Sequence, residues 1–157
     1  ERDTIFLASL AGALRPMPGA LETVAAVRRM GFCTALATSG HRRYVPVALR
    51  ELGLVDMFDT IVTGDMVAHG KPAPDIFLCA AQQLRVDPKH CVVVEDAPHG
   101  IAAAHAAGMF AIAIPNDMTR ELDLSQADHV CSSLIEFRFW LEQQRPERSA
   151  EQVSDED

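Results

Sequence analysis

Three short polar segments each follow an apolar run or a turn, and their residue types could together handle a phosphate group. In the first, Thr38 and Ser39 end an apolar run and precede Gly40. Hydroxyls at a strand end, followed by a glycine turn, can offer an O–H and free backbone N–H groups to a phosphate. On this motif alone, the alternative is that one hydroxyl caps the next helix.

The second segment is a loop, 70–75, which holds a lysine beside two prolines. Because proline has a fixed backbone φ, the two prolines of this loop restrict where Lys71 projects. The Lys71 side chain can supply a positive charge to a phosphate. A solvated surface lysine is the alternative. Asp75, at the end of the loop, is expected to cap the helix that follows.

The third segment places two adjacent carboxylates, Glu95 and Asp96, after an apolar run and before Pro98. Burying unpaired carboxylates is costly, so a cation is expected to compensate them. Mg²⁺ suits this pair, because it binds through one or two carboxylates together with waters and substrate phosphate. The alternative is that one carboxylate caps the next helix while the other stays in solvent. Hydroxyl, lysine and acidic pair together favour phosphoryl-transfer chemistry.

The elements that must position these groups alternate between short apolar runs and longer helical patterns. We expect strands at 32–38, 60–63, 91–95, 110–114 and 129–131, with helices between them. Several runs are almost wholly apolar, which is typical of strands covered on both faces. The alternation predicts an α/β fold with a parallel sheet covered by helices, and ligands in such sheets bind at the carboxyl ends of the strands.

A length of 157 residues favours a single core domain, which we place at 15–142. Residues 1–14 carry apolar side chains four apart and are interpreted as a helix with no strand before it. Residues 143–157 are polar and acidic and are interpreted as a disordered tail.

The charge balance, 14 basic against 22 acidic residues, excludes some partners. Nucleic-acid binding is not expected, because phosphate neutralisation needs clustered Lys and Arg. Membrane insertion is not expected either, since no apolar run reaches the roughly 18 residues of a span. The first residues lack the pattern of a signal peptide. The four cysteines are expected to be small buried hydrophobes in a reducing compartment, so we predict a cytoplasmic protein.

The order and spacing of the motifs resemble the haloacid dehalogenase superfamily, in particular the branch that holds β-phosphoglucomutase and pseudouridine-5′-phosphatase. The resemblance covers about 15–141, and the residues that carry it read MPG at 17–19, ALATS at 35–39, HGKPAPDIFL at 69–78 and VEDAPHG at 94–100. It implies a Rossmann-like core and a Mg²⁺-dependent phosphatase or phosphomutase acting on a small phosphorylated sugar or nucleoside. A phosphorelay receiver domain has similar groups, but there the acidic pair comes first in the chain.

The resemblance also implies a role for each site residue. The hydroxyl of Thr38 would hold the phosphoryl group, with help from the backbone of Ser39. Lys71 would neutralise charge on the nucleophile and the phosphate. The resemblance also suggests that the peptide bond between Lys71 and Pro72 is cis. Glu95 and Asp96 would hold Mg²⁺.

One departure from the family pattern is large. The family's first motif, D-x-D-G-[TV], supplies the Asp nucleophile and the Asp acid/base at the end of the first, central strand. No such motif occurs in the 157 residues. By resemblance, the central strand and most of the helical cap would then be missing, residues 1–14 would be a remnant of the cap, and any aspartyl-phosphate would form on an Asp outside this chain.

This departure predicts a gap in the sheet between the strands that end at Thr38 and Glu95. Unpaired strand edges are costly when buried, so we expect the chain to self-associate, to recruit a strand from elsewhere such as a separate N-terminal segment, or to be marginally stable. We expect the chain alone to be inactive. The alternative function is a non-catalytic remnant of the same fold that binds phosphate or a partner.

Overall fold

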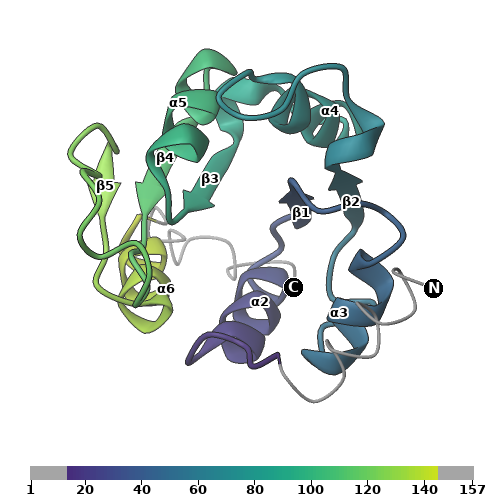
Figure 1. Ribbon diagram of the computed structural model, residues 1–157. Helices are drawn as coiled ribbons and strands as arrows, with labels where there is room; N and C mark the ends of the chain where they lie inside the picture. The colour runs from purple at the N-terminus through teal and green to yellow at the C-terminus, as the bar shows by residue number, and fades with distance from the viewer. Residues whose placement is uncertain (1–13, 145–157) are drawn as a thin grey trace, which may run out of the picture.

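The structure is a computed structural model that describes residues 14–144. Residues 1–13 of the helix predicted at 1–14, and residues 145–157 of the tail predicted at 143–157, lie outside the described residues. The elements in chain order (Figure 1) are α2 (Ala20–Arg29), β1 (Ala35–Thr38), α3 (Val45–Glu51), β2 (Thr60–Thr63), η1 (Gly64–Met66), α4 (Asp75–Leu84), η2 (Pro88–His90), β3 (Val92–Glu95), α5 (Pro98–Ala106), β4 (Phe110–Ala113), β5 (His129–Val130) and α6 (Leu134–Gln143).

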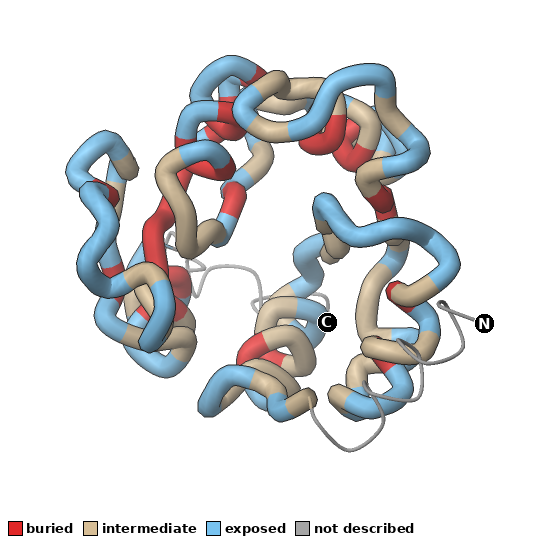
Figure 2. Tube along the Cα trace, in the orientation of Figure 1, coloured by how far each residue is buried: buried red, intermediate tan, exposed pale blue. Residues whose placement is uncertain are grey.

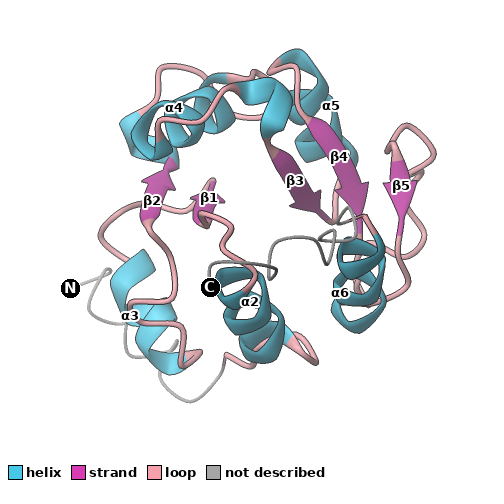
Figure 3. Cartoon of the chain, turned by 180° about the vertical axis from the view of Figure 1, so that it is seen from behind, coloured by secondary structure: helices cyan, strands magenta, loops and turns pink. Residues whose placement is uncertain are grey.

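The described strands form two parallel sheets, one of β1 and β2 and one in the order β3-β4-β5. The register sets Ala35 opposite Thr60, Val92 opposite Phe110 and Ile112 opposite His129. The predicted α/β fold with parallel pairing is therefore confirmed. The expected gap is confirmed too, because β1 and β3 are not paired with each other in residues 14–144. Figure 3 shows the two sheets as separate groups, with α4 and α5 linking them at one end.

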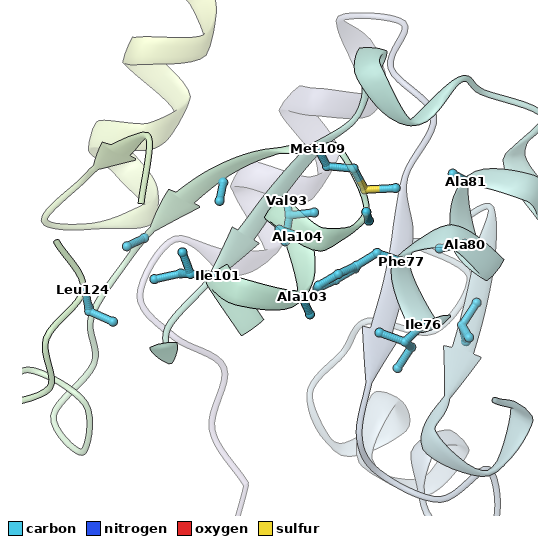
Figure 4. Close-up of a cluster of buried hydrophobic side chains, with 14 residues drawn as sticks. Ile76, Phe77, Ala80, Ala81, Val93, Ile101, Ala103, Ala104, Met109 and Leu124 are labelled. Atoms are coloured by element: carbon cyan, nitrogen blue, oxygen red, sulfur yellow. The ribbon is translucent and has the colours of Figure 1, made fainter. Parts of the chain in front are cut away.

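Strand β4 is covered on both faces. Successive side chains of a strand point to opposite faces, so its residues divide between two hydrophobic clusters. Ala111 and Ala113 join the cluster that α4 and α5 build (Figure 4), whereas Ile112 packs with Phe137 and Leu141 of α6. The expectation of helices on both faces of the sheet is confirmed for this strand.

Strand β3 differs from that expectation. Val93 is only 7% exposed, but Val92 and Val94 on the opposite face are 45% and 40% exposed. Figure 2 shows the contrast between this strand and the buried stretch of its neighbour β4. The apolar run 91–95 predicted cover on both faces, and within residues 14–144 only one face of it is buried.

Helices α2 and α6 contact each other on the side of the molecule opposite α4 and α5 (Figure 1). Ser133 begins α6 by accepting a hydrogen bond from the Glu136 N–H at 3.1 Å, and the Glu136 carboxylate accepts one from the backbone N–H of Ser132. This reciprocal arrangement satisfies N–H groups at the helix start. The hydroxyl of Thr23 in α2 donates to the Leu134 carbonyl at 3.3 Å, which ties the two helices together.

All four cysteines are free, but only Cys131 is buried. Cys33 is exposed, so the expectation that the thiols are buried is wrong for that residue. It lies in the loop before β1, which begins only at Ala35 rather than at the predicted position 32. None of the helices within residues 14–144 has the length and apolar character that crossing a bilayer requires.

Candidate active site

Lys71 joins the ends of two strands that belong to different sheets. Its Nζ forms an ion pair with Glu95 at the end of β3 and donates to the carbonyl of Ala37 in β1 at 3.5 Å. The side chains of Lys71 and Glu95 are 15% and 9% exposed. The ammonium also lies 4.9 Å from the centre of the Phe77 ring, a cation–π contact. The alternative of a solvated surface lysine is therefore excluded.

The two-proline loop holds Lys71 in this place. Its peptide bond to Pro72 is cis, as the resemblance suggested. Asp75 is the first residue of α4 rather than its cap, because Pro74 occupies the capping position. The carboxylate of Asp75 instead accepts a hydrogen bond from the backbone N–H of His69 at 3.2 Å, and it lies 3.0 Å from the Nδ1 atom of that residue. The predicted capping role of Asp75 is wrong, and its carboxylate fastens the start of the loop.

Thr38 and Ser39 lead from β1 into a tight turn. The Thr38 hydroxyl accepts a hydrogen bond from the Gly40 N–H at 3.0 Å, and its proton can still be donated to another group. Neither hydroxyl caps the next helix, because α3 begins only at Val45. Gly64 lies against this turn, where a Cβ would come 2.6 Å from the Ser39 carbonyl oxygen. Only glycine lets the end of β2 approach so closely.

Asp65 fastens the loop that follows Ser39 to the end of β2. Its Oδ1 accepts hydrogen bonds from the Arg42 backbone N–H at 2.9 Å and from the Thr63 hydroxyl at 2.8 Å. Its Oδ2 lies 3.1 Å from Arg42 Nε. The backbone hydrogen bond from Arg42 is the main reason that the pKa of Asp65 falls below its ordinary value. The ionised carboxylate thus holds the loop in place at neutral pH.

Glu95 lies against the first turn of α5. A Cβ at Gly100 would overlap the Glu95 carboxyl group, so glycine is required for the carboxylate to fit there. The N-terminus of a helix favours negative charge. Glu95 Oε2 also accepts a hydrogen bond from the Asp96 N–H at 3.2 Å. Ala97, which has no capping side chain, precedes the helix, so the alternative that one of the two carboxylates caps α5 is excluded.

Asp96 is bound by a residue that the sequence motifs do not indicate. Asn116 Nδ2 donates a hydrogen bond to Asp96 Oδ2 at 2.7 Å. Asn116 follows β4, and the pairing of β4 with β3 continues through the Ile114 N–H, which donates to the Glu95 carbonyl at 2.8 Å. This pairing brings the loop after β4 beside the acidic pair. The contact between Asn116 and Asp96 could therefore be found only from the pairing of β3 with β4, and not from a local sequence pattern.

The two carboxylates are the acidic groups of this site, and they suit one kind of ion. Within residues 14–144, no group of three or more His, Cys, Asp or Glu side chains could hold a metal ion. Mg²⁺ binds through as few as one or two carboxylates and completes its shell with waters and phosphate oxygens. The chemistry of the donor set therefore fits Mg²⁺ better than Zn²⁺, which takes three or four protein ligands.

Parallel strands with phosphate-compatible groups near their carboxyl ends define a candidate site for phosphate chemistry in an α/β fold. The comparisons with known proteins identify the family. The haloacid dehalogenase-like hydrolase family matches residues 2–108, which is more than half of the chain. The chain belongs to the haloacid dehalogenase-like hydrolase family.

Its relatives include enzymes of phosphate ester chemistry. The chain is 36% identical over 121 residues to the validoxylamine A 7'-phosphate phosphatase of Streptomyces hygroscopicus subsp. limoneus, covering 77% of this chain and 56% of that protein. It is 41% identical over 98 residues to the beta-phosphoglucomutase of Bacillus subtilis (strain 168), covering 62% and 42%. The crystal structure of CbbY from Rhodobacter sphaeroides in complex with phosphate is similar with a TM-score of 0.78 and 34% identity, covering 84% of this chain and 60% of that one.

These matches also show how much of a relative the chain represents. It spans about half the length of the curated relatives it matches.

Proposed function

We propose that this chain carries the phosphate- and Mg²⁺-binding part of a phosphatase or phosphomutase active site that acts on a small phosphorylated sugar or nucleoside. The ion pair between Lys71 and Glu95 is the observation that carries the proposal. It brings the end of β1, with its hydroxyls, to the end of β3, with its carboxylates. The names of the phosphatase and phosphomutase relatives support phosphate ester chemistry. We also propose a cytoplasmic location, where the four free cysteines would stay reduced.

In the proposed site, the hydroxyl of Thr38 and the backbone N–H of Ser39 donate hydrogen bonds to the phosphoryl oxygens. The ammonium of Lys71 neutralises their charge. Lys71 has donor capacity for this, because an ammonium carries three N–H groups and its bond to the Ala37 carbonyl is long, at 3.5 Å. Positioning and charge neutralisation are the main protein contributions to phosphoryl transfer.

Glu95 and Asp96 are the proposed Mg²⁺ ligands. The ion, when bound, would stabilise negative charge on the phosphoryl oxygens. Two observations support the fit. Gly100 leaves room for the Glu95 carboxylate beside the α5 N-terminus. Glu95 is paired with an ammonium, whereas Asp96 is bound by a neutral amide that leaves its charge uncancelled.

The attacking group would come from outside these 157 residues, because they contain no D-x-D-G-[TV] motif. In the proposed reaction, an oxygen of the motif's first Asp would bond to phosphorus as the bond to the leaving oxygen breaks, and the second Asp would protonate that oxygen to release the alcohol. Attack on phosphorus by water, or by an acceptor hydroxyl in a phosphomutase, would then break the bond to the Asp and free its carboxylate, with the second Asp taking up the proton. The strand that carries this motif would fit between β1 and β3, which are not paired with each other in residues 14–144. A separate N-terminal segment or a second copy of the chain would cover these edges.

Hydrolysis of p-nitrophenyl phosphate in the presence of Mg²⁺ tests the proposal. We expect the 157-residue chain alone to show no hydrolysis above background. Fusing a relative's N-terminal segment, chosen for its D-x-D-G-[TV] motif, should restore activity, as should supplying it as a second chain. In the restored enzyme, Lys71→Ala should remove most of the activity. Lys89→Ala is the matched control, because that lysine is 68% exposed and pairs with Asp87.

Two results would overturn this proposal. Robust hydrolysis by the chain alone, lost on Ser39→Ala, would show that no external Asp is needed. A fused protein that folds, binds phosphate and remains inactive would favour the non-catalytic binding role instead.

A further inference from the structure

We infer that Asn116 is a positioning residue for a divalent cation: it holds one oxygen of the Asp96 carboxylate so that the group is presented to the ion in a fixed orientation. The inference rests on the proposed function of Asp96 as a Mg²⁺ ligand. Its starting observation is the hydrogen bond of 2.7 Å from Asn116 Nδ2 to Asp96 Oδ2.

The orientation of the Asn116 amide is fixed by its other contacts. Its Oδ1 accepts hydrogen bonds from the backbone N–H groups of Met118 at 2.8 Å and Thr119 at 3.1 Å. Backbone N–H groups can only donate, so the end of the amide that faces them is the oxygen. The NH₂ end therefore faces Asp96. The amide cannot flip without placing donor against donor on one side and acceptor against acceptor on the other.

The backbone of Asn116 is held as firmly as its side chain. Its N–H donates to the Thr119 hydroxyl at 3.0 Å, and its carbonyl accepts from the Arg120 N–H at 2.9 Å. Upstream, Ile114 is 2% exposed and its N–H bonds to the Glu95 carbonyl at 2.8 Å. The pairing of β4 with β3 thus fixes the position of the Asn116 amide relative to Glu95 and Asp96.

Glu95 and Asp96 differ in the charge of the group that each one contacts. Glu95 forms an ion pair with Lys71, whereas the donor to Asp96 is a neutral amide. An amide orients a carboxylate without cancelling its charge. A carboxylate has about four acceptor positions, so one hydrogen bond from Asn116 leaves most of them for a cation. Orientation without neutralisation is what a partner behind a metal ligand supplies, and losing such a partner typically weakens metal binding about 10–100-fold.

A pair of variants separates this role from a merely structural one. Asn116→Ser removes the donor to Asp96 but keeps a side-chain oxygen that can accept from the loop N–H groups. Thr119→Val loosens the loop, because it removes the hydroxyl that accepts from the Asn116 N–H, but it keeps the amide. If Asn116 acts through Asp96, the first variant weakens cation binding and the second does not.

The measurement is a Mn²⁺ titration of the 157-residue chain, followed by paramagnetic broadening of its backbone amide NMR signals. Mn²⁺ is a suitable probe, since it takes the same oxygen ligands as Mg²⁺. We expect broadening around Glu95 and Asp96, with an apparent dissociation constant at least about tenfold higher in Asn116→Ser and unchanged in Thr119→Val. Without metal, the side-chain amide signals of Asn116 should shift on Asp96→Ala.

Each other outcome overturns the inference in a different way. Equal Mn²⁺ affinity in wild type and Asn116→Ser would overturn it and leave the proposed function standing. Equal weakening in both variants would assign Asn116 a role in loop order only. A wild-type chain that shows no broadening near Glu95 and Asp96 would overturn the inference together with the Mg²⁺ part of the proposed function.

Discussion

Strands β3 and β4 are neighbours in one sheet and are similarly apolar, yet their surroundings differ. β4 has partners on both edges and buried side chains on both faces, with Ile112 fully buried. In the part of the chain that the structure describes, β3 is paired on one edge, and Val92 and Val94 are 45% and 40% exposed. Exposed valines on a strand with an open edge form a surface that another strand would bury. The candidate site lies beside the unpaired edge of β3. Glu95 ends β3, and Lys71, its ion-pair partner, also contacts β1.

The largest expected effect is on the free energy of unfolding, which should fall much more when a side chain of β4 is shortened than when one of β3 is. Ile112→Ala leaves a cavity in a fully buried position, so we expect it to lower the free energy of unfolding by about 4 kcal/mol. Val94 is 40% exposed, so Val94→Ala removes atoms that already contact solvent in part and should cost about 1 kcal/mol or less. Urea denaturation of the two variants measures both values. Similar costs would mean that β3 is as well covered in solution as β4.

The ion pair between the sheets comes next. Lys71→Met keeps much of the packing against Phe77 but leaves the Glu95 carboxylate unpaired, so we expect a loss of about 3 kcal/mol in the free energy of unfolding. Adding Glu95→Gln should recover most of this loss, because removing both charges leaves no unpaired one. A double variant no more stable than Lys71→Met alone, again measured in urea, would show that the charge pairing does not hold the two sheets together.

Features that depend on neighbouring residues in the chain could be predicted from the sequence, whereas contacts between distant residues could not. The run 60–63 is a strand as expected, because its β-branched residues lie between clear turns. Burial of β3 on both faces could not be judged from its own residues, since an apolar run does not show what packs on it. The contact of Asn116 with Asp96 was equally hidden, because it joins loops 20 positions apart through strand pairing. The capping role expected of Asp75 failed by one residue, since α4 begins at Asp75 itself.

The exposed face of β3 should also affect association. We expect the chain to self-associate as its concentration rises, and Val94→Lys to weaken this association about tenfold, because a charge replaces apolar contact area. Val130→Lys, at a valine that is 48% exposed on the opposite edge strand β5, is the matched control and should leave association unchanged. Sedimentation velocity measures all three proteins. A wild-type chain that stays monomeric at every concentration would contradict the expectation.

The smallest expected effect tests how β4 is held at its start. Asp128 Oδ2 accepts a hydrogen bond from the Ala111 N–H at 2.7 Å and lies 2.9 Å from His105 Nε2. The hydrogen bond from Ala111 is the main cause that lowers the pKa of Asp128 below its ordinary value. A carboxyl whose pKa is lower in the folded than in the unfolded chain contributes stability above its unfolded pKa, about 4. That contribution is lost as the pH falls through the folded pKa.

We therefore expect Asp128→Asn to destabilise the chain at pH 7 and to cost progressively less below about pH 4. The loss at pH 7 should be about 1 kcal/mol or less, because the Asp128 side chain is 37% exposed and solvent weakens its interactions. Urea denaturation at several pH values gives the difference between variant and wild type. Asp117→Asn, at a side chain 92% exposed, is the control and should show little difference at any pH. A cost for Asp128→Asn that stays constant down to pH 3 would assign the effect to packing rather than to the charged carboxylate that anchors β4.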